Sequence, residues 1–164
     1  MEDWESTCRI TKVMQEDTFG CGVACLAMVA KIYYAEAKRT FIKHGLDSEN
    51  RPDRRKPFAT IFQQLIRVLD DHTPGSKKEP WRGWDRFEGV GIIKVECRPK
   101  GGNGDWHWVV AEKHDRFDVV VHDPYHALPS FRKRPPEGVE CDPFENHVSC
   151  GDWIRVPMPL RGLT

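Results

Sequence analysis

Cys21 is the first residue with a capacity for chemistry, because it lies where a polar stretch gives way to a long apolar one. From Val23 to about Tyr34 apolar residues cover every side of a helical wheel, which predicts a helix buried all round. A cysteine in the first turn of such a helix meets unpaired backbone N–H groups and the positive end of the helix dipole, which favour the thiolate. The pattern fits a cysteine nucleophile and a small buried hydrophobe equally well.

His107 and Asp123 are the second pair of candidates, and a predicted hairpin brings them together. Two apolar strands, 105–111 and 117–123, flank a short polar connection. If the turn is centred on Asp115, His107 lies opposite Asp123 on the same face of the hairpin. A carboxylate in that position would hold the tautomer of the imidazole and stabilise its charge. The rest of this face is small and apolar and is predicted to pack on a helix: Val109, Ala111, Val119 and Val121.

Three further histidines compete with His107. His114 falls in the predicted turn and His122 on the opposite face, so both are expected to be solvated. His126 follows Asp123 in a loop and stays an alternative to His107 on pattern alone.

No metal and no cofactor are predicted. The six cysteines form no CxxC pair, and metal binding through Cys21 and Cys25 lacks two further ligands at a compatible spacing. In a reducing cytosol we expect thiols, whereas Cys141 and Cys150 flank a loop that a disulfide could close in an oxidising compartment.

Composition predicts one domain over residues 1–164, with no nucleic acid or membrane as partner. Twenty-five basic residues balance twenty-five acidic ones, and the sequence pI is near 7.0. The N-terminus lacks the apolar region of a secretory signal, and the longest apolar run is too short to span a bilayer. We therefore expect a soluble cytoplasmic protein, unless a specialised secretion system exports it.

The predicted elements are helices first and strands afterwards, which is the order of an α+β domain with an antiparallel sheet. The expected helices beside the central one are Ala35–His44 and Phe58–Leu69, after a short strand at Arg9–Met14. Charged loop residues Asp47–Pro57 are predicted to be solvated. His72–Gly89 is predicted as a long loop. Its aromatic residues, Trp81, Trp84 and Phe87, are expected to anchor it, and a wall of the substrate cleft is the alternative role. The expected strands are Val90–Cys97, Trp106–Lys113, Phe117–Asp123 and Asp152–Met158, with a turn at Pro99–Asp105.

Two blocks of sequence together resemble the double-glycine leader peptidases, which are papain-like cysteine peptidases that process bacteriocin precursors. The first is Gln15, five residues, and then Cys21-Gly22-x-Ala24-Cys25-Leu26-Ala27-Met28. The second is His107-Trp108-Val109-Val110 with Asp123-Pro124 sixteen residues after the histidine. The chain departs from the family at Gly20, where members usually carry an aspartate. Residues 47–89 and the chain after Pro129 have no counterpart in these motifs.

The resemblance implies a papain-like fold and a catalytic role for each matched residue. Cys21 would be the nucleophile, His107 the base, Asp123 its orienting acid and Gln15 the oxyanion-hole donor. The predicted partner is a protein or peptide substrate, and the favoured activity is that of a peptidase. A glutamine deamidase or acyltransferase effector on the same fold stays an alternative, because both use the same acyl-enzyme. A catalytically inert binding module is the alternative from a different class.

Overall fold

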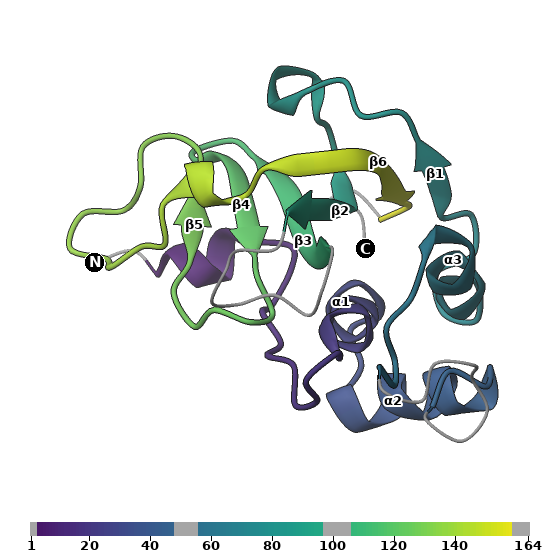
Figure 1. Cartoon of the computed structure of the whole chain (residues 1–164). Helices are drawn as coiled ribbons and strands as arrows, with labels where there is room; N and C mark the ends of the chain where they lie inside the picture. The colour runs from purple at the N-terminus through teal and green to yellow at the C-terminus, as the bar shows by residue number, and fades with distance from the viewer. Residues whose placement is uncertain (1–2, 48–55, 97–105, 159–164) are drawn as a thin grey trace.

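The computed structural model describes residues 3–47, 56–96 and 106–158, in which helices precede most of the sheet (Figure 1). The α-helices of this part are α1 (Cys21–Ala30), α2 (Tyr34–Lys43) and α3 (Phe62–Asp70). Its strands are β1 (Lys77–Glu79), β2 (Val90–Glu96), β3 (Trp106–His114), β4 (Asp118–His122), β5 (Ser130–Phe131) and β6 (Ser149–Val156). Short 3-10 helices are η1 (Trp4–Thr7), η2 (Trp84–Arg86) and η3 (Phe144–Asn146).

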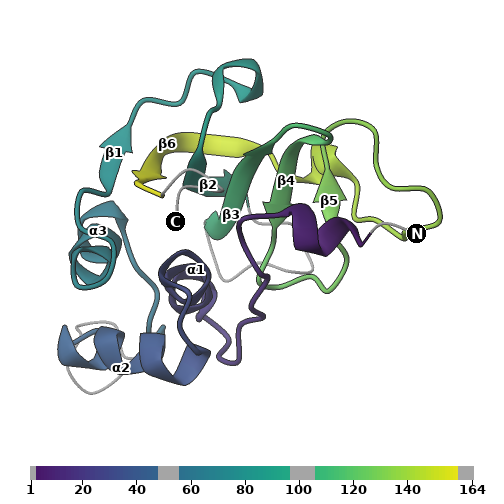
Figure 2. The same cartoon turned by 180° about the vertical axis from the view of Figure 1, so that it is seen from behind.

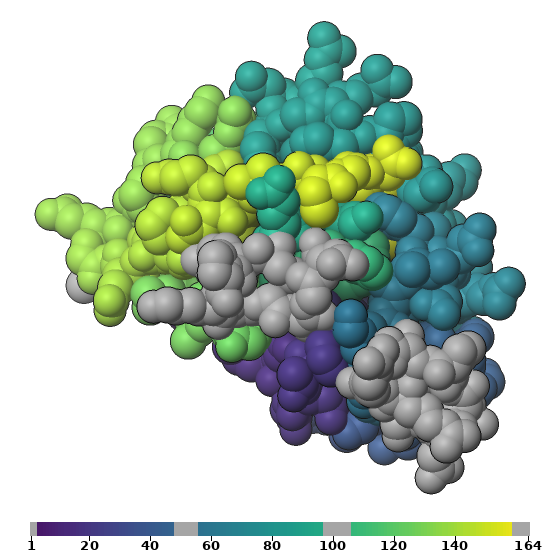
Figure 3. Space-filling view, in the orientation of Figure 1, coloured from purple at the N-terminus to yellow at the C-terminus, as the bar shows by residue number. Residues whose placement is uncertain are grey.

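The strands form one sheet in the order β1-β6-β2-β3-β4-β5, and all neighbouring pairs are antiparallel. The helices lie together on one side of this sheet, with α1 beside β3 and α3 beside β1 (Figures 1 and 2). In the space-filling view the purple and blue of the helical layer lie below the yellow of β6 (Figure 3). The predicted α+β class with an antiparallel sheet is confirmed. None of the helices in the described ranges combines the length and the apolar character that crossing a membrane requires.

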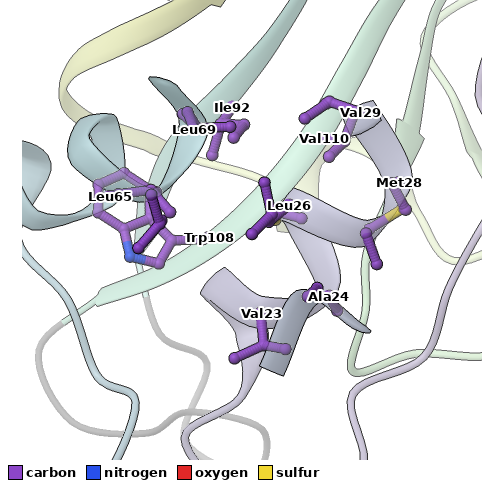
Figure 4. Close-up of a cluster of buried hydrophobic side chains, with 14 of the residues drawn as sticks. Val23, Ala24, Leu26, Met28, Val29, Leu65, Leu69, Ile92, Trp108 and Val110 are labelled. Atoms are coloured by element: carbon purple, nitrogen blue, oxygen red, sulfur yellow. The ribbon is translucent and has the colours of Figure 1, made fainter. Parts of the chain in front are cut away.

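Helix α1 forms the centre of the larger core, as its all-round apolar sequence predicts. Every residue from Cys21 to Val29 is buried. The helix packs between the sheet and the other helices, and its closest surroundings include Leu65 and Leu69 of α3 and Ile92, Trp108 and Val110 of the sheet (Figure 4). A helix packed on several sides is held rigidly, so α1 can fix the position of whatever stands at its first residue.

The predicted end of this helix at Tyr34 is wrong, because α1 stops at Ala30. Lys31 adopts the left-handed conformation with φ 57°, and its N–H donates to the carbonyl of Ala27. The Ile-Tyr-Tyr run that follows favours a helix only weakly. Tyr34 instead begins α2, and its hydroxyl donates to Asp17 Oδ2 at 2.7 Å, which ties the start of α2 to the segment before α1.

Two further segments, at Arg9–Met14 and at Phe58, differ from the prediction. Arg9–Met14 forms no strand, because the carboxylate of Glu112 in β3 accepts the backbone N–H groups of Arg9 and Ile10, at 3.1 and 2.9 Å. Phe58 lies outside α3 with a φ of 72°, although its ring is buried as the helical periodicity required. The short strands β1 and β5 both fall in segments that carry no strand pattern.

The aromatic segment before β2 covers the other face of the sheet. Trp81 and Phe87 pack on the ring of Trp153, and Trp84 packs on both of them, so the predicted anchoring of this loop is confirmed. The same cluster contains Val109, Ala111, Val119 and Val121, which the sequence predicted to pack on a helix. That prediction is wrong, because α1 packs on the opposite face, at Trp108 and Val110. Small strand residues accept flat indole rings as readily as they accept a helix.

Gly91 provides the space for this aromatic layer and yields a first prediction. A Cβ at Gly91 would lie 2.3 Å from the Trp153 ring and 2.9 Å from the carbonyl of Ile154. Gly91→Ala is therefore expected to destabilise the fold by about 1–3 kcal/mol, measured by urea denaturation. Trp153→Leu should remove most of the clash, so the double variant should lose less stability than the two single losses added together. Additive losses would contradict this packing.

Candidate active site

Cys21 is the first residue of α1, where the sequence predicted it. Gly20 precedes it as the N-cap, and a Cβ at that position would lie 2.2 Å from the Tyr34 hydroxyl oxygen. Any side chain at position 20 would therefore displace Tyr34 from its hydrogen bond with Asp17. This contact gives a local reason for the departure at Gly20, where the resembled family usually has an aspartate.

His107 and Asp123 meet in the structure, although the predicted register is wrong by two residues. Val110 pairs with His122 instead of Val120, because the turn is centred on Arg116. A register shift of two residues keeps every side chain on its predicted face of the sheet, so His107 and Asp123 still lie on the same face. Strand β4 pairs only with Val110–His114, which leaves His107 beside the point where the chain leaves β4. There His107 Nε2 lies 2.7 Å from Asp123 Oδ1.

The ring of His107 connects Asp123 with Cys21. Since Nε2 is bonded to Asp123, Nδ1 is the nitrogen that remains for its hydrogen bond with the Cys21 thiol. Burial lowers the pKa of His107, but the hydrogen bonds and charges of Asp123 and Cys21 outweigh it and raise this pKa to about 9. At neutral pH the buried ring is therefore an imidazolium beside the thiol.

Asp123 is the anion of this site. Burial raises the pKa of its carboxyl, but hydrogen bonds from His107 and His147 more than offset burial and hold the pKa well below its usual range. The backbone N–H of Tyr125 donates to the same oxygen as His107, at 2.9 Å. Asp123 is therefore ionised over the whole physiological range of pH, and its orientation is fixed from several sides.

Cys25, one helical turn after Cys21, is chemically different from it. Burial raises the pKa of Cys25 well above its ordinary value, and the charges of Cys21 and Asp123 raise it further. Cys21, by contrast, is hydrogen-bonded to the His107 imidazolium. Cys21 is itself buried, with 1% of its surface exposed, so it does not stand at an open helix end.

Gln15 is joined to the site through its backbone. Its N–H donates to the carbonyl of Pro124 at 2.9 Å, which links the segment before α1 to the loop after Asp123. The side-chain amide donates to the carbonyls of Asp17 and Thr18, at 3.1 and 3.0 Å. Its Oε1 is buried without a hydrogen-bond partner in the described part of the chain. Gln15 thus braces the turn before Cys21, and its amide hydrogens point to that turn.

The competing histidines have other roles. His122, expected to be solvated, is buried with Nε2 3.7 Å from Glu112 Oε2, because the segment at Ile10 covers this face. His114 is half-buried, bonded to Thr7 at 2.9 Å and stacked on Phe117, so it too is not simply solvated. The carbonyl of His126 accepts from Lys12 Nζ in the loop after Asp123. His107 is the imidazole that the structure joins to the Cys21 thiol by a hydrogen bond.

Sequence reasoning missed His147, which contacts Asp123 from the side opposite His107. Its Nε2 lies 3.3 Å from Asp123 Oδ2 and 3.6 Å from Asp142 Oδ2. His147 lies between η3 and β6, in the part of the chain after Pro129 that no recognised motif covers. No periodicity or spacing connects it with Asp123, so only the folded chain identifies it. Cys141 and Cys150, which flank it, carry free thiols in the structure.

Hydrogen bonding accounts for the two clusters of potential metal ligands in the described ranges. These clusters are Cys8, Glu112 and His114, and Asp123, Asp142 and His147, each with its ligand atoms within 4.8 Å of one another. Glu112 already accepts two backbone N–H groups, and Asp123 already holds His107. We therefore interpret both clusters as hydrogen-bonded networks.

The arrangement thus contains a thiol, an imidazolium and a carboxylate in contact, which is the set that a cysteine nucleophile requires. No model of a known protein family matches the chain, and no curated protein has a similar sequence.

Proposed function

We propose that this protein is a papain-like cysteine hydrolase that cleaves a peptide bond in a protein or peptide substrate. The observation that carries the proposal is the position of His107, which is hydrogen-bonded to both Cys21 and Asp123. A nucleophile whose base is oriented by a third group is the arrangement of a catalytic triad. The fold supports it, because a helix that begins with the cysteine packs on the antiparallel sheet that carries the histidine.

In the proposed reaction the Cys21 thiolate attacks the carbonyl carbon, and the carbonyl electron pair moves to oxygen. When the tetrahedral intermediate collapses, the C–N bond breaks and His107 gives its proton to the leaving amine. Water then attacks the thioester while His107 takes its proton. The C–S bond breaks, the acid is released, and the thiolate–imidazolium pair returns. Asp123 stays ionised throughout and holds the ring.

The oxyanion of the intermediate would form at the first turn of α1, where the helix dipole favours negative charge. In the proposal its donors are the backbone N–H of Cys21 and the side-chain amide of Gln15. The Gln15 amide now donates to the carbonyls of Asp17 and Thr18, so one of these two bonds must be exchanged for the oxyanion when substrate binds.

Peptide hydrolysis is preferred to glutamine deamidation on the resemblance of the two sequence blocks to leader peptidases. Both reactions pass through the same acyl-enzyme and differ only in whether the leaving group is a peptide amine or ammonia. Transfer to an acceptor amine in place of water would make the same site an acyltransferase.

The experiment that tests the proposal combines three forms of the protein with intact proteins and with a peptide library. Wild type and Cys25→Ala should generate new peptide termini by mass spectrometry, and Cys21→Ala should not. Cys25→Ala is the matched control, because it removes a thiol one turn along the same helix. Conversion of amides to acids in uncut chains would mean deamidation, and a coupled adduct would mean acyl transfer.

Two outcomes would refute the proposed enzymatic function. Cys21→Ala as active as wild type would show that another group performs the chemistry. A partner that binds equally to wild type and Cys21→Ala, and that neither alters, would identify a binding module.

A further inference from the structure

His147 closes a buried chain of polar contacts behind the proposed triad. Its side chain is 2% exposed and its Nε2 faces two carboxylates, Asp123 at 3.3 Å and Asp142 at 3.6 Å. On the other side of the ring, Nδ1 lies 3.5 Å from Ser130 Oγ at the start of β5. The contacts therefore run from Cys21 through His107, Asp123 and His147 to Ser130.

Two buried carboxylates so close together require a donor or a cation between them, because like charges would otherwise drive one of them to bind a proton. Within the described residues His147 Nε2 lies between Asp123 and Asp142. Two further cations lie near these carboxylates: the His107 imidazolium, which is bonded to Asp123, and Lys12. Burial lowers the pKa of Lys12, and the charges of Asp123 and Asp142 oppose that effect. The Lys12 ammonium itself donates to the carbonyls of His126 and Leu128.

The local backbone holds His147 in this place. Its N–H donates to the carbonyl of Phe144 at 3.0 Å, which closes η3. Asn146 donates to the other oxygen of Asp142 at 3.0 Å, and the N–H of Asp142 donates to the carbonyl of Pro129 at 2.8 Å. The bonds of Asn146 and His147 thus fix the shape of the segment, and the bond of Asp142 ties it to the residue before β5.

We propose that His147 is a positioning residue of the triad, whose Nε2–H fixes Asp123 Oδ2 so that Oδ1 stays directed at His107. This role rests on the proposed function, because it matters only if His107 serves Cys21. A carboxylate held at one oxygen alone can turn about its last bond, and the imidazolium would then lose its partner for part of the time. His147 removes that freedom from the side that no triad residue occupies.

Two variants of His147 that carry the same amide group on side chains of different length test its positioning of Asp123. In His147→Gln the amide nitrogen falls near the position of Nε2 and can still donate to Asp123. In His147→Asn it falls near Nδ1 and cannot. Both are polar and tolerated in a loop, so a difference between them reports the donor to Asp123. His72→Gln is the control for loss of a histidine elsewhere, since the ring of His72 hydrogen-bonds the hydroxyl of Thr40 in α2 at 2.8 Å.

The readout is the titration of the His107 ring by NMR on protein labelled with nitrogen-15, which needs no substrate. His147→Asn should titrate His107 at a pH lower than wild type by about one pH unit, and His147→Gln and His72→Gln should follow wild type. An unchanged titration in His147→Asn would overturn the positioning role, and so would an equal shift in both His147 variants.

A measurement on the wild type keeps the proposal falsifiable if His147→Asn does not fold. The Nε2 proton of His147 should give a slowly exchanging resonance with a scalar or dipolar connection to Asp123, and its absence would also overturn the role. The proposed function fails separately from this inference. If the wild type shows no turnover that depends on Cys21, the proposed enzymatic function is refuted, but the shift of the His107 titration in His147→Asn can still be observed. If turnover is normal and His147→Asn does not shift the titration, only the role of His147 is refuted.

Discussion

Asp123→Asn is expected to lower kcat by about 10³–10⁴-fold while leaving the protein folded, as in other triads whose acid is replaced. The carboxylate of Asp123 accepts from His107 Nε2, His147 Nε2 and the backbone N–H of Tyr125. An asparagine has one acceptor oxygen, so its amide hydrogens must face one of these donors. The negative charge is lost as well, and the pKa of His107 should fall with it. A neutral imidazole would then face a neutral thiol at physiological pH.

The control for this variant is Asp118→Asn in β4, the strand that ends just before Asp123. Asp118 pairs with Lys113 and Arg132 at 2.6 and 2.7 Å, away from the site, and its φ of 64° is one that asparagine tolerates. It should therefore keep wild-type turnover, and thermal unfolding should show both variants folded. Turnover of Asp123→Asn within about tenfold of wild type would remove Asp123 from the triad.

Activity is expected to collapse as pH rises through about 9, the pH at which His107 gives up its proton. The leaving amine needs that proton, so kcat/KM should fall above this pH although the thiolate remains. Alkylation of Cys21 needs only the thiolate and should persist in the same range. A pH profile of both rates separates the two events. Parallel loss of turnover and alkylation would contradict the assigned roles.

The same group makes stability depend on pH in a defined direction. The pKa of His107 is raised above its ordinary value of 6.5, so its contribution to the free energy of unfolding is complete below about pH 6.5. The contribution is then lost as pH rises through about 9. Asp123 has the opposite dependence: its pKa is lowered, so its contribution is present above its ordinary pKa near 3.8 and is lost at more acidic pH. Urea denaturation should therefore find the full contribution of both groups to the free energy of unfolding between about pH 3.8 and about pH 6.5.

The sequence predicts the parts of this site that depend on the periodicity of a helix or of a strand. The all-round apolar run identifies α1 and places Cys21 in its first turn. The alternation of strands places His107 and Asp123 on one face, and that result survives the wrong register because the error is an even number of residues. A shift of one residue would have placed Asp123 on the opposite face.

The parts that the sequence does not predict depend on contacts between distant segments. His147 reaches Asp123 only because η3 and β6 bring it behind β4. The end of α1 is a lysine in the left-handed conformation, Lys31, whose ammonium donates to the carbonyl of Arg9 in the segment before the helix. Arg9 and Ile10 remain outside the sheet because Glu112, about a hundred residues away, takes their N–H groups. No local pattern carries any of these three contacts.

The central claim is that His107 activates Cys21, and alkylation with iodoacetamide at about pH 6 tests it most directly. Mass spectrometry of the digested protein gives the rate for each cysteine. Cys21 should react first, ahead of Cys25, whose pKa burial raises strongly, and ahead of Cys141 and Cys150, whose pKa values burial also raises. His107→Ala should slow the reaction of Cys21 and leave that of Cys150 unchanged. If Cys21 reacts no faster than Cys150, or reacts equally fast without His107, then Cys21 is a buried structural thiol and the account of the site is wrong.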